Sequence, residues 1–211
     1  MRSASLSLLF VLLATSPALA QIQQPIPPFV IDVRGFFAGL GQDPVTAEDL
    51  AIDPESLPKR ALGGAIGLTF YPIRRQRFAL GLGGEGLLAR GRSQPVDAEG
   101  LPLGPQIERR LQSLAGQLSF NFGHRDGWSY ISAGMGPLLF ETFLGAEAPQ
   151  VSPARDMTLN FGGGARWFTS RHLAFCFDLR FYETKPALTT LTNPGRERKR
   201  ILVLSVGAAF K

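Results

Sequence analysis

Residues 173–182 read LAFCFDLRFY, and this stretch decides the fold. Every second side chain is large and apolar, whereas the positions between hold alanine, cysteine, tyrosine or a charged residue. Successive side chains of a β-strand point to opposite faces, so alternation with a period of two is typical of a strand. The apolar face comprises Leu173, Phe175, Phe177, Leu179 and Phe181. The stretch therefore predicts a strand with one apolar face and one small or charged face.

The same alternation recurs along the chain. In residues 202–210, for example, Leu202, Leu204 and Val206 share one face. For the fifth stretch, residues 128–143, the sequence does not show which face is apolar. An even number of antiparallel strands can close into a barrel that leaves no edge unpaired. We expect eight strands, over residues 29–41, 61–72, 78–91, 107–123, 128–143, 156–169, 173–185 and 199–210.

The connections between these stretches alternate in length. Residues 73–77, 124–127 and 170–172 form short turns. Barrels of bacterial outer membranes have long extracellular loops and short periplasmic turns, and this chain keeps the same order. We therefore expect both termini to lie in the periplasm. The long connections, rich in Pro, Gly, Asp, Ser and Thr, are residues 42–60, 92–106, 144–155 and 186–198.

The two faces of the strands also differ in size. A water-soluble barrel packs its large apolar side chains inward and exposes polar ones. Here the opposite face is rich in glycine, alanine and polar residues, which cannot fill an apolar core at normal density. The large apolar face is therefore predicted to meet lipid. The sequence predicts an all-β fold, an eight-stranded antiparallel up-and-down transmembrane β-barrel.

The first residues have the features of an export signal. Arg2 supplies a positive charge, residues 8–14 form a short apolar run, and Ala18-Leu19-Ala20 has the small residues of a cleavage site. We expect a secretory signal peptide over residues 1–20, an N-terminal periplasmic linker over 21–28, and an outer-membrane barrel domain over 29–211.

Aromatic residues gather where this topology predicts a membrane interface. With the short turns in the periplasm, ten aromatic side chains fall near that end of the barrel, as in an aromatic girdle. They are Phe29, Phe70, Tyr71, Phe78, Phe120, Phe122, Trp128, Tyr130, Trp167 and Phe210.

The glycine and aromatic pattern of the strands resembles that of a known family. Residues 131–136 read ISAGMG, and residues 202–210 close the chain on Phe210, which Lys211 follows. With these features the chain resembles the eight-stranded outer-membrane β-barrel family, which includes OmpA-type transmembrane barrels and small porin-like proteins of the Gram-negative cell envelope. The resemblance implies a place in the outer membrane and insertion by the barrel-assembly machinery, which reads a terminal aromatic residue.

Six charged residues fall on the inward face of the predicted strands. Eight strands enclose an interior just wide enough for side chains to fill it, and an unpaired charge there would be costly. We expect these charges to pair and plug the lumen; the alternative is a narrow channel for small solutes or ions. The predicted lumen network comprises Asp32, Arg34, Glu85, Arg166, Asp178 and Arg180.

A lipid A-modifying enzyme is the least favoured alternative. Some barrels of the family are lipid A-modifying enzymes, and the deacylases among them use a serine and a histidine at the membrane-facing surface. The histidines here, His124 and His172, fall in short turns, and Cys176 lacks an activating environment. The acidic first loop matches no calcium-binding pattern, so a solvated loop is expected. We predict no enzyme activity, cofactor or metal.

A set of basic residues falls near the predicted extracellular rim. Lipopolysaccharide phosphates lie at that depth, and arginine pairs well with phosphate. The formal net charge of +5 is small for an exported chain, so no nucleic-acid partner is expected. We predict a structural or surface-interaction role in contact with outer-membrane lipid; a soluble lipocalin-like binding barrel is another alternative. The predicted phosphate contacts are Arg90, Arg92, Arg109, Arg110, Arg198 and Arg200.

Overall fold

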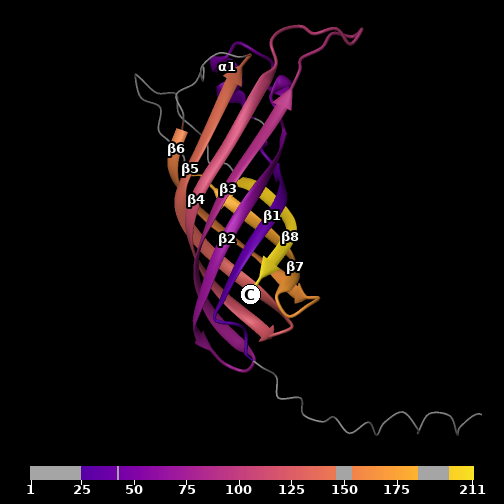
Figure 1. Ribbon diagram of the computed structural model, residues 1–211. Helices are drawn as coiled ribbons and strands as arrows, with labels where there is room; N and C mark the ends of the chain where they lie inside the picture. The colour runs from indigo at the N-terminus through magenta and orange to yellow at the C-terminus, as the bar shows by residue number, and fades with distance from the viewer. Residues whose placement is uncertain (1–24, 42, 146–153, 185–199) are drawn as a thin grey trace, which may run out of the picture.

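The computed structural model describes residues 25–41, 43–145, 154–184 and 200–211. It is a closed barrel of eight strands in the order β1 to β8, each antiparallel to its neighbours (Figure 1). The predicted fold class is correct, and the observed strand ends lie within two residues of the expected ones. The strands are β1 (Phe29–Gly39), β2 (Arg60–Arg74), β3 (Phe78–Ser93), β4 (Ile107–His124), β5 (Gly127–Leu144), β6 (Ala154–Phe168), β7 (Leu173–Glu183) and β8 (Arg200–Phe210).

The barrel closes between its first and last strands. β1 pairs with β8 from Ile31 opposite Phe210 to Gly39 opposite Leu202. The strands differ in length, with 11 residues in β1, β7 and β8 and 18 in β4 and β5. In Figure 1 the long strands extend upward beyond the short ones on the side where the first loop sits.

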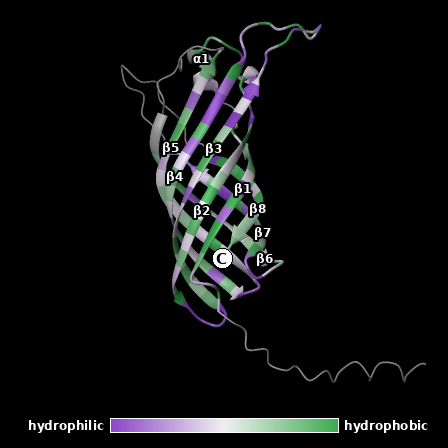
Figure 2. Ribbon diagram, in the orientation of Figure 1, coloured by the Kyte–Doolittle hydropathy of each residue, from purple (hydrophilic) through white to green (hydrophobic). Residues whose placement is uncertain are grey.

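The outer wall is apolar. Leu62, Leu114 and Ile131 have 70%, 67% and 60% of their surface exposed, far above the values for buried leucine and isoleucine. Hydrophobic residues recur along the middle of the strands in Figure 2. The fifth strand, whose faces the sequence left open, points Ile131 and Met135 outward and Trp128 and Tyr130 inward. The helices of the described residues are too short to cross a membrane.

Side chains point into the lumen in three layers. Toward the long loops lies an apolar layer that includes Phe36, Leu87 and Leu111. A charged layer occupies the middle of the barrel. Toward the short turns lies a second apolar layer, which includes Ile26 and Trp128. Ile26 belongs to the predicted linker, yet its side chain is fully buried, so packing of the barrel begins before residue 29.

The predicted aromatic girdle is correct in part. Seven of its members are exposed on the outer wall: Phe29, Phe70, Phe78, Phe120, Phe122, Trp167 and Phe210. Tyr71, Trp128 and Tyr130 instead point into the lumen, where they are 1%, 3% and 5% exposed. These three lie at the inward positions of their strands, so placing them in the girdle was wrong.

The first long connection is folded. Glu48, Asp53 and Glu55 are exposed, as expected of a solvated loop, whereas Asp43 is buried. The connection contains α1 (Pro44–Asp49) and a turn of 3-10 helix, η1 (Pro54–Ser56). Asp43 caps α1 by accepting a hydrogen bond from the Thr46 backbone N–H at 3.3 Å. Ala47 and Leu57 pack on Ile107 at the start of β4. The loop therefore forms a small apolar cap at the long-loop end of the barrel.

Candidate functional site

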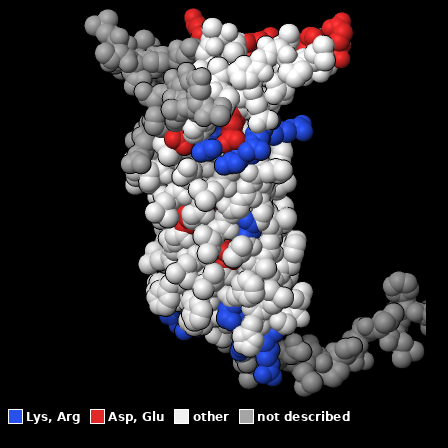
Figure 3. All heavy atoms as spheres, turned by 45° about the horizontal axis from the view of Figure 1, so that its top comes forward, with Lys and Arg blue, Asp and Glu red and all other residues white. Residues whose placement is uncertain are grey.

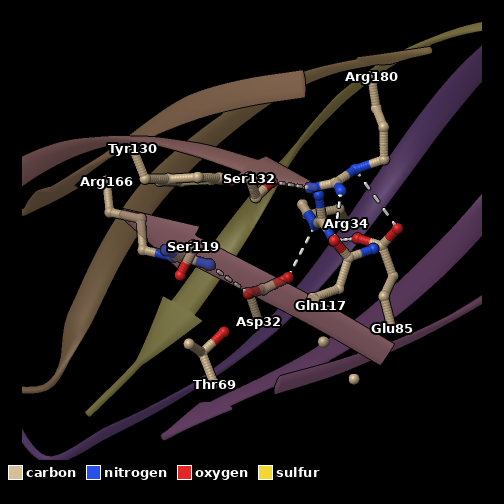
Figure 4. Close-up of a pocket in the computed structure, with 12 residues that line it drawn as sticks. Asp32, Arg34, Thr69, Glu85, Gln117, Ser119, Tyr130, Ser132, Arg166 and Arg180 are labelled. Atoms are coloured by element: carbon tan, nitrogen blue, oxygen red, sulfur yellow. Dashed lines mark hydrogen bonds and ion pairs between the residues drawn. The ribbon is translucent and has the colours of Figure 1, made fainter. Parts of the chain in front are cut away.

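The structure brings all six predicted lumen residues into one network in the middle layer. Figure 4 shows Asp32, Arg34, Glu85, Arg166 and Arg180 of this network. Arg34 lies at its centre and contacts three carboxylates. Its Nε is 2.7 Å from Asp32 Oδ1, its Nη1 is 3.3 Å from Asp178 Oδ1, and its Nη2 binds Glu85. These side chains come from β1, β3 and β7, so the network ties together strands that are not neighbours in the sheet.

The other two arginines complete the pairing. Arg166 Nη2 lies 2.8 Å from Asp32 Oδ2, and its guanidinium lies 4.5 Å from the centroid of the Tyr130 ring. Arg180 lies 3.1 Å from Asp178 and 3.6 Å from Glu85. Three guanidinium groups thus face three carboxylates, and the formal charge of the network is zero. Pairing of this kind is required for charges buried away from water.

Three polar side chains that the sequence analysis did not place in the lumen network belong to it. The Tyr130 hydroxyl donates to Asp178 at 2.8 Å and the Tyr182 hydroxyl donates to Glu85 at 2.7 Å. Gln117 Oε1 accepts from Arg180 at 2.7 Å. All three occupy inward positions of their strands, so the period-two pattern contained the signal that would have found them.

The network leaves little free space. A Cβ atom at Gly67 would lie 2.8 Å from Asp32 Oδ1, so glycine is needed there to admit the carboxylate. A cavity of about 30 Å³ remains beside Arg34, Thr69, Ser119 and Ser132. That is room for one or two water molecules rather than for a solute.

A second charged site lies on the outer wall at the long-loop end. Arg90 and Arg92 of β3 and Arg110 of β4 surround Glu108 at N–O distances of 3.1, 2.9 and 2.6 Å. The register explains this arrangement, because Arg90 stands opposite Arg110 and Arg92 opposite Glu108. Arg110 also lies over the Phe143 ring at 4.3 Å. We call Arg90, Arg92, Glu108 and Arg110 the rim cluster.

The four residues of the rim cluster have an excess of two positive charges, since three guanidinium groups share one carboxylate; the next acid, Glu141 of β5, stands opposite Arg110. Basic residues gather at the same level in Figure 3, above a mostly uncharged wall. Arg200, on the other side of the barrel, also faces outward and pairs with Glu183 at 2.5 Å. Arg198 lies outside the described residues.

Arg109 does not belong with these residues, which corrects its place among the predicted phosphate contacts. It lies between Glu108 and Arg110 in β4, so its side chain points to the opposite face and is 1% exposed. Its Nη2 is 3.1 Å from Asp43 Oδ2, and its guanidinium lies 4.8 Å from the Phe140 ring centroid. Arg109 therefore fastens the folded first loop to the barrel and is closed to lipid.

Both histidines lie at the short turns, as predicted. His124 Nδ1 accepts a hydrogen bond from the Asp126 backbone N–H at 3.3 Å, and His172 is exposed. Cys176 is buried in the apolar layer toward the short turns. Among the residues that the structure describes, no cluster of His, Cys, Asp and Glu side chains is placed to hold a metal ion.

No protein-family model matches the chain, and no curated protein matches its sequence. Neisserial surface protein A has a similar structure, with a TM-score of 0.51 at 12% identity over 88% of this chain and 97% of that one. OprG of Pseudomonas aeruginosa gives a TM-score of 0.48 at 9% identity over 89% and 97% of the two chains. Ail of Yersinia pestis gives 0.46 at 12% identity over 86% and 95%. The chain thus has the eight-stranded barrel fold of outer-membrane proteins.

Proposed function

We propose that this protein is an integral outer-membrane barrel with a closed lumen, and that its rim cluster binds the phosphate groups of lipopolysaccharide. The observation that supports this most directly is the distribution of polarity. Large apolar side chains cover the outer wall, while paired charges fill the middle of the barrel. In water this arrangement would expose the apolar surface, whereas in a bilayer it places that surface against acyl chains.

The packing of the lumen favours a structural or surface role over the alternative of a narrow channel. A solute would have to pass two apolar layers and an ion-paired layer whose cavity holds only one or two water molecules. When the protein is reconstituted in planar bilayers, we expect no conductance steps beyond those recorded for the bilayer without protein. Steady ion-selective steps would instead favour the channel.

The rim cluster supports the choice of lipopolysaccharide as a partner. It lies at the upper edge of the apolar wall, at the depth where phosphates of the outer leaflet are expected if the long loops are extracellular. Guanidinium groups bind phosphate through two parallel hydrogen bonds, and the excess positive charge of the cluster is not cancelled by Glu108.

The test compares two triple variants that remove the same charge at opposite ends of the barrel. R90Q/R92Q/R110Q should lower lipopolysaccharide binding by the purified barrel about tenfold or more, the effect of losing about 1.4 kcal/mol. R75Q/R77Q/R171Q, altered in the short turns, should lower this binding by less. Equal binding by the unaltered protein and the rim variant would contradict the assignment of the rim cluster.

A further inference from the structure

The short-turn end of the barrel carries a second cationic surface. It consists of six basic residues in or beside the three turns, and Asp126 is the one acid in these turns. The excess is therefore five positive charges, more than that of the rim cluster. We call this the short-turn surface, and it comprises Arg74, Arg75, Arg77, Arg125, Arg171 and Lys211.

Hydrogen bonds hold the three turns together as one surface. The Gly123 backbone N–H donates to the Arg77 carbonyl at 2.9 Å, which joins the first turn to the second. Lys211 Nζ donates to the Arg125 carbonyl at 2.6 Å, and the Lys211 backbone N–H donates to the His172 carbonyl at 3.2 Å. The third turn is thus joined to the second through the end of β8.

Three arginines of this surface are open to a ligand. Arg75, Arg77 and Arg171 are exposed, and Figure 3 shows basic residues at the lower end of the molecule. Lys211 is partly covered and lies 3.6 Å from the Phe168 ring centroid; this burial, with the nearby charge of Arg125, lowers the pKa of its amine. Arginines therefore supply most of the charge, and they keep it at any physiological pH.

The outer-wall aromatics adjoin the short-turn surface. Phe78 directly follows Arg77, and Phe210 directly precedes Lys211; both aromatic rings are exposed on the outer wall. Aromatic side chains of membrane proteins settle at the level of the lipid headgroups. If the barrel spans the membrane as proposed above, the arginines lie beside the phosphates of the leaflet at the short-turn end.

We propose that the short-turn surface binds phospholipids whose headgroup carries a net negative charge, in preference to zwitterionic ones. Basic residues close to a membrane surface attract anionic lipids, and arginine binds their phosphates directly. A zwitterionic headgroup adds an ammonium group, for which the turns offer only Asp126. The proposal rests on the membrane location proposed above.

The experiment measures lipids bound to the mature barrel in mild detergent by native mass spectrometry, with phosphatidylglycerol and phosphatidylethanolamine offered together. The unaltered protein should retain phosphatidylglycerol at least tenfold better. R75Q/R77Q/R171Q should lose most of this preference, whereas R90Q/R92Q/R110Q, with the same loss of charge, should lose less of it. A heat-dependent shift in gel mobility verifies that each variant is folded.

Three outcomes would overturn the proposal: no preference in the unaltered protein, an equal loss in both triple variants, or binding of soluble polyphosphate as tight as that of the lipid. If the triple variant does not fold, Arg75→Gln and Arg171→Gln are tested singly, and each should lower the preference by at least twofold. A protein that purifies without detergent and shows no mobility shift would refute the membrane location itself, which separates the two failures.

Discussion

The lumen network and the rim cluster each contain three arginines, but they differ in the number of carboxylates and in contact with water. In the lumen, Arg34, Arg166 and Arg180 meet three carboxylates, and every side chain is at most 7% exposed. At the rim, three arginines that are 39–52% exposed share Glu108. We infer that the first set is structural, because its charges are balanced and buried, and that the second can bind an anion, because its excess positive charge is exposed.

The largest effect is expected from an arginine placed where neither carboxylates nor water are available. Leu204 faces outward on β8, between Phe37 and Leu179 of the neighbouring strands. Leu204→Arg should abolish the yield of folded barrel in the membrane, because arginine at the bilayer midplane costs about 2–4 kcal/mol.

The matched control places the same residue at the upper edge of the wall. Leu62 also faces outward and lies opposite Arg90. Leu62→Arg should assemble normally, since the cost falls to about 0–1 kcal/mol near the interface. The membrane yield of folded barrel, measured by gel mobility, should therefore be much lower for Leu204→Arg than for Leu62→Arg. Equal yields would contradict the placement of the outer wall in lipid.

After this loss of assembly, the largest effect on the stability of the assembled barrel is expected in the lumen. Arg34→Met leaves Asp32, Glu85 and Asp178 with too few cations, and removing one partner from a buried ion pair typically costs about 3–5 kcal/mol. Urea unfolding of the reconstituted barrel measures the loss. Adding Glu85→Gln to Arg34→Met should recover part of the stability, because one unmatched carboxylate is removed. No recovery would indicate that packing, and not charge balance, sets the stability there.

A smaller effect is expected where Arg109 fastens the first loop. Arg109→Met removes the ion pair that Arg109 makes with the buried Asp43 carboxylate, at a cost of about 1–3 kcal/mol. The cost should appear mainly in the loop, as faster protease cleavage between residues 40 and 59 while the barrel retains its heat-dependent mobility. Arg110→Met, one residue along but on the outer wall, should leave the cleavage rate unchanged.

The smallest effect on stability is expected at the rim, and it sharpens the contrast with the lumen. Glu108→Gln breaks partly exposed ion pairs and should change the free energy of unfolding by at most about 1 kcal/mol. It also removes the carboxylate that competes with phosphate, so lipopolysaccharide binding should become tighter. Glu85→Gln removes the same group from the lumen and should destabilise the barrel more, without a change in that binding.

The alternation of side chains made the barrel and its inward charges predictable. Within a strand, the face of one residue determines the face of all the others. Asp32, Arg166 and Asp178 could therefore each be assigned to the lumen from the pattern of its own strand. The same rule, followed to the strand ends, would have placed Arg109 and Tyr71 inside. The contacts of Asp43 and Leu57 with β4 were not predictable, because they join segments distant in the sequence.

The most direct test of the central claim is the gel mobility of the protein in the outer-membrane fraction, compared before and after boiling in detergent. A closed barrel whose apolar wall meets lipid should be recovered with that fraction, run as a compact band when unboiled, and shift on heating. Recovery of the protein in the soluble fraction, with one mobility before and after boiling, would contradict the account.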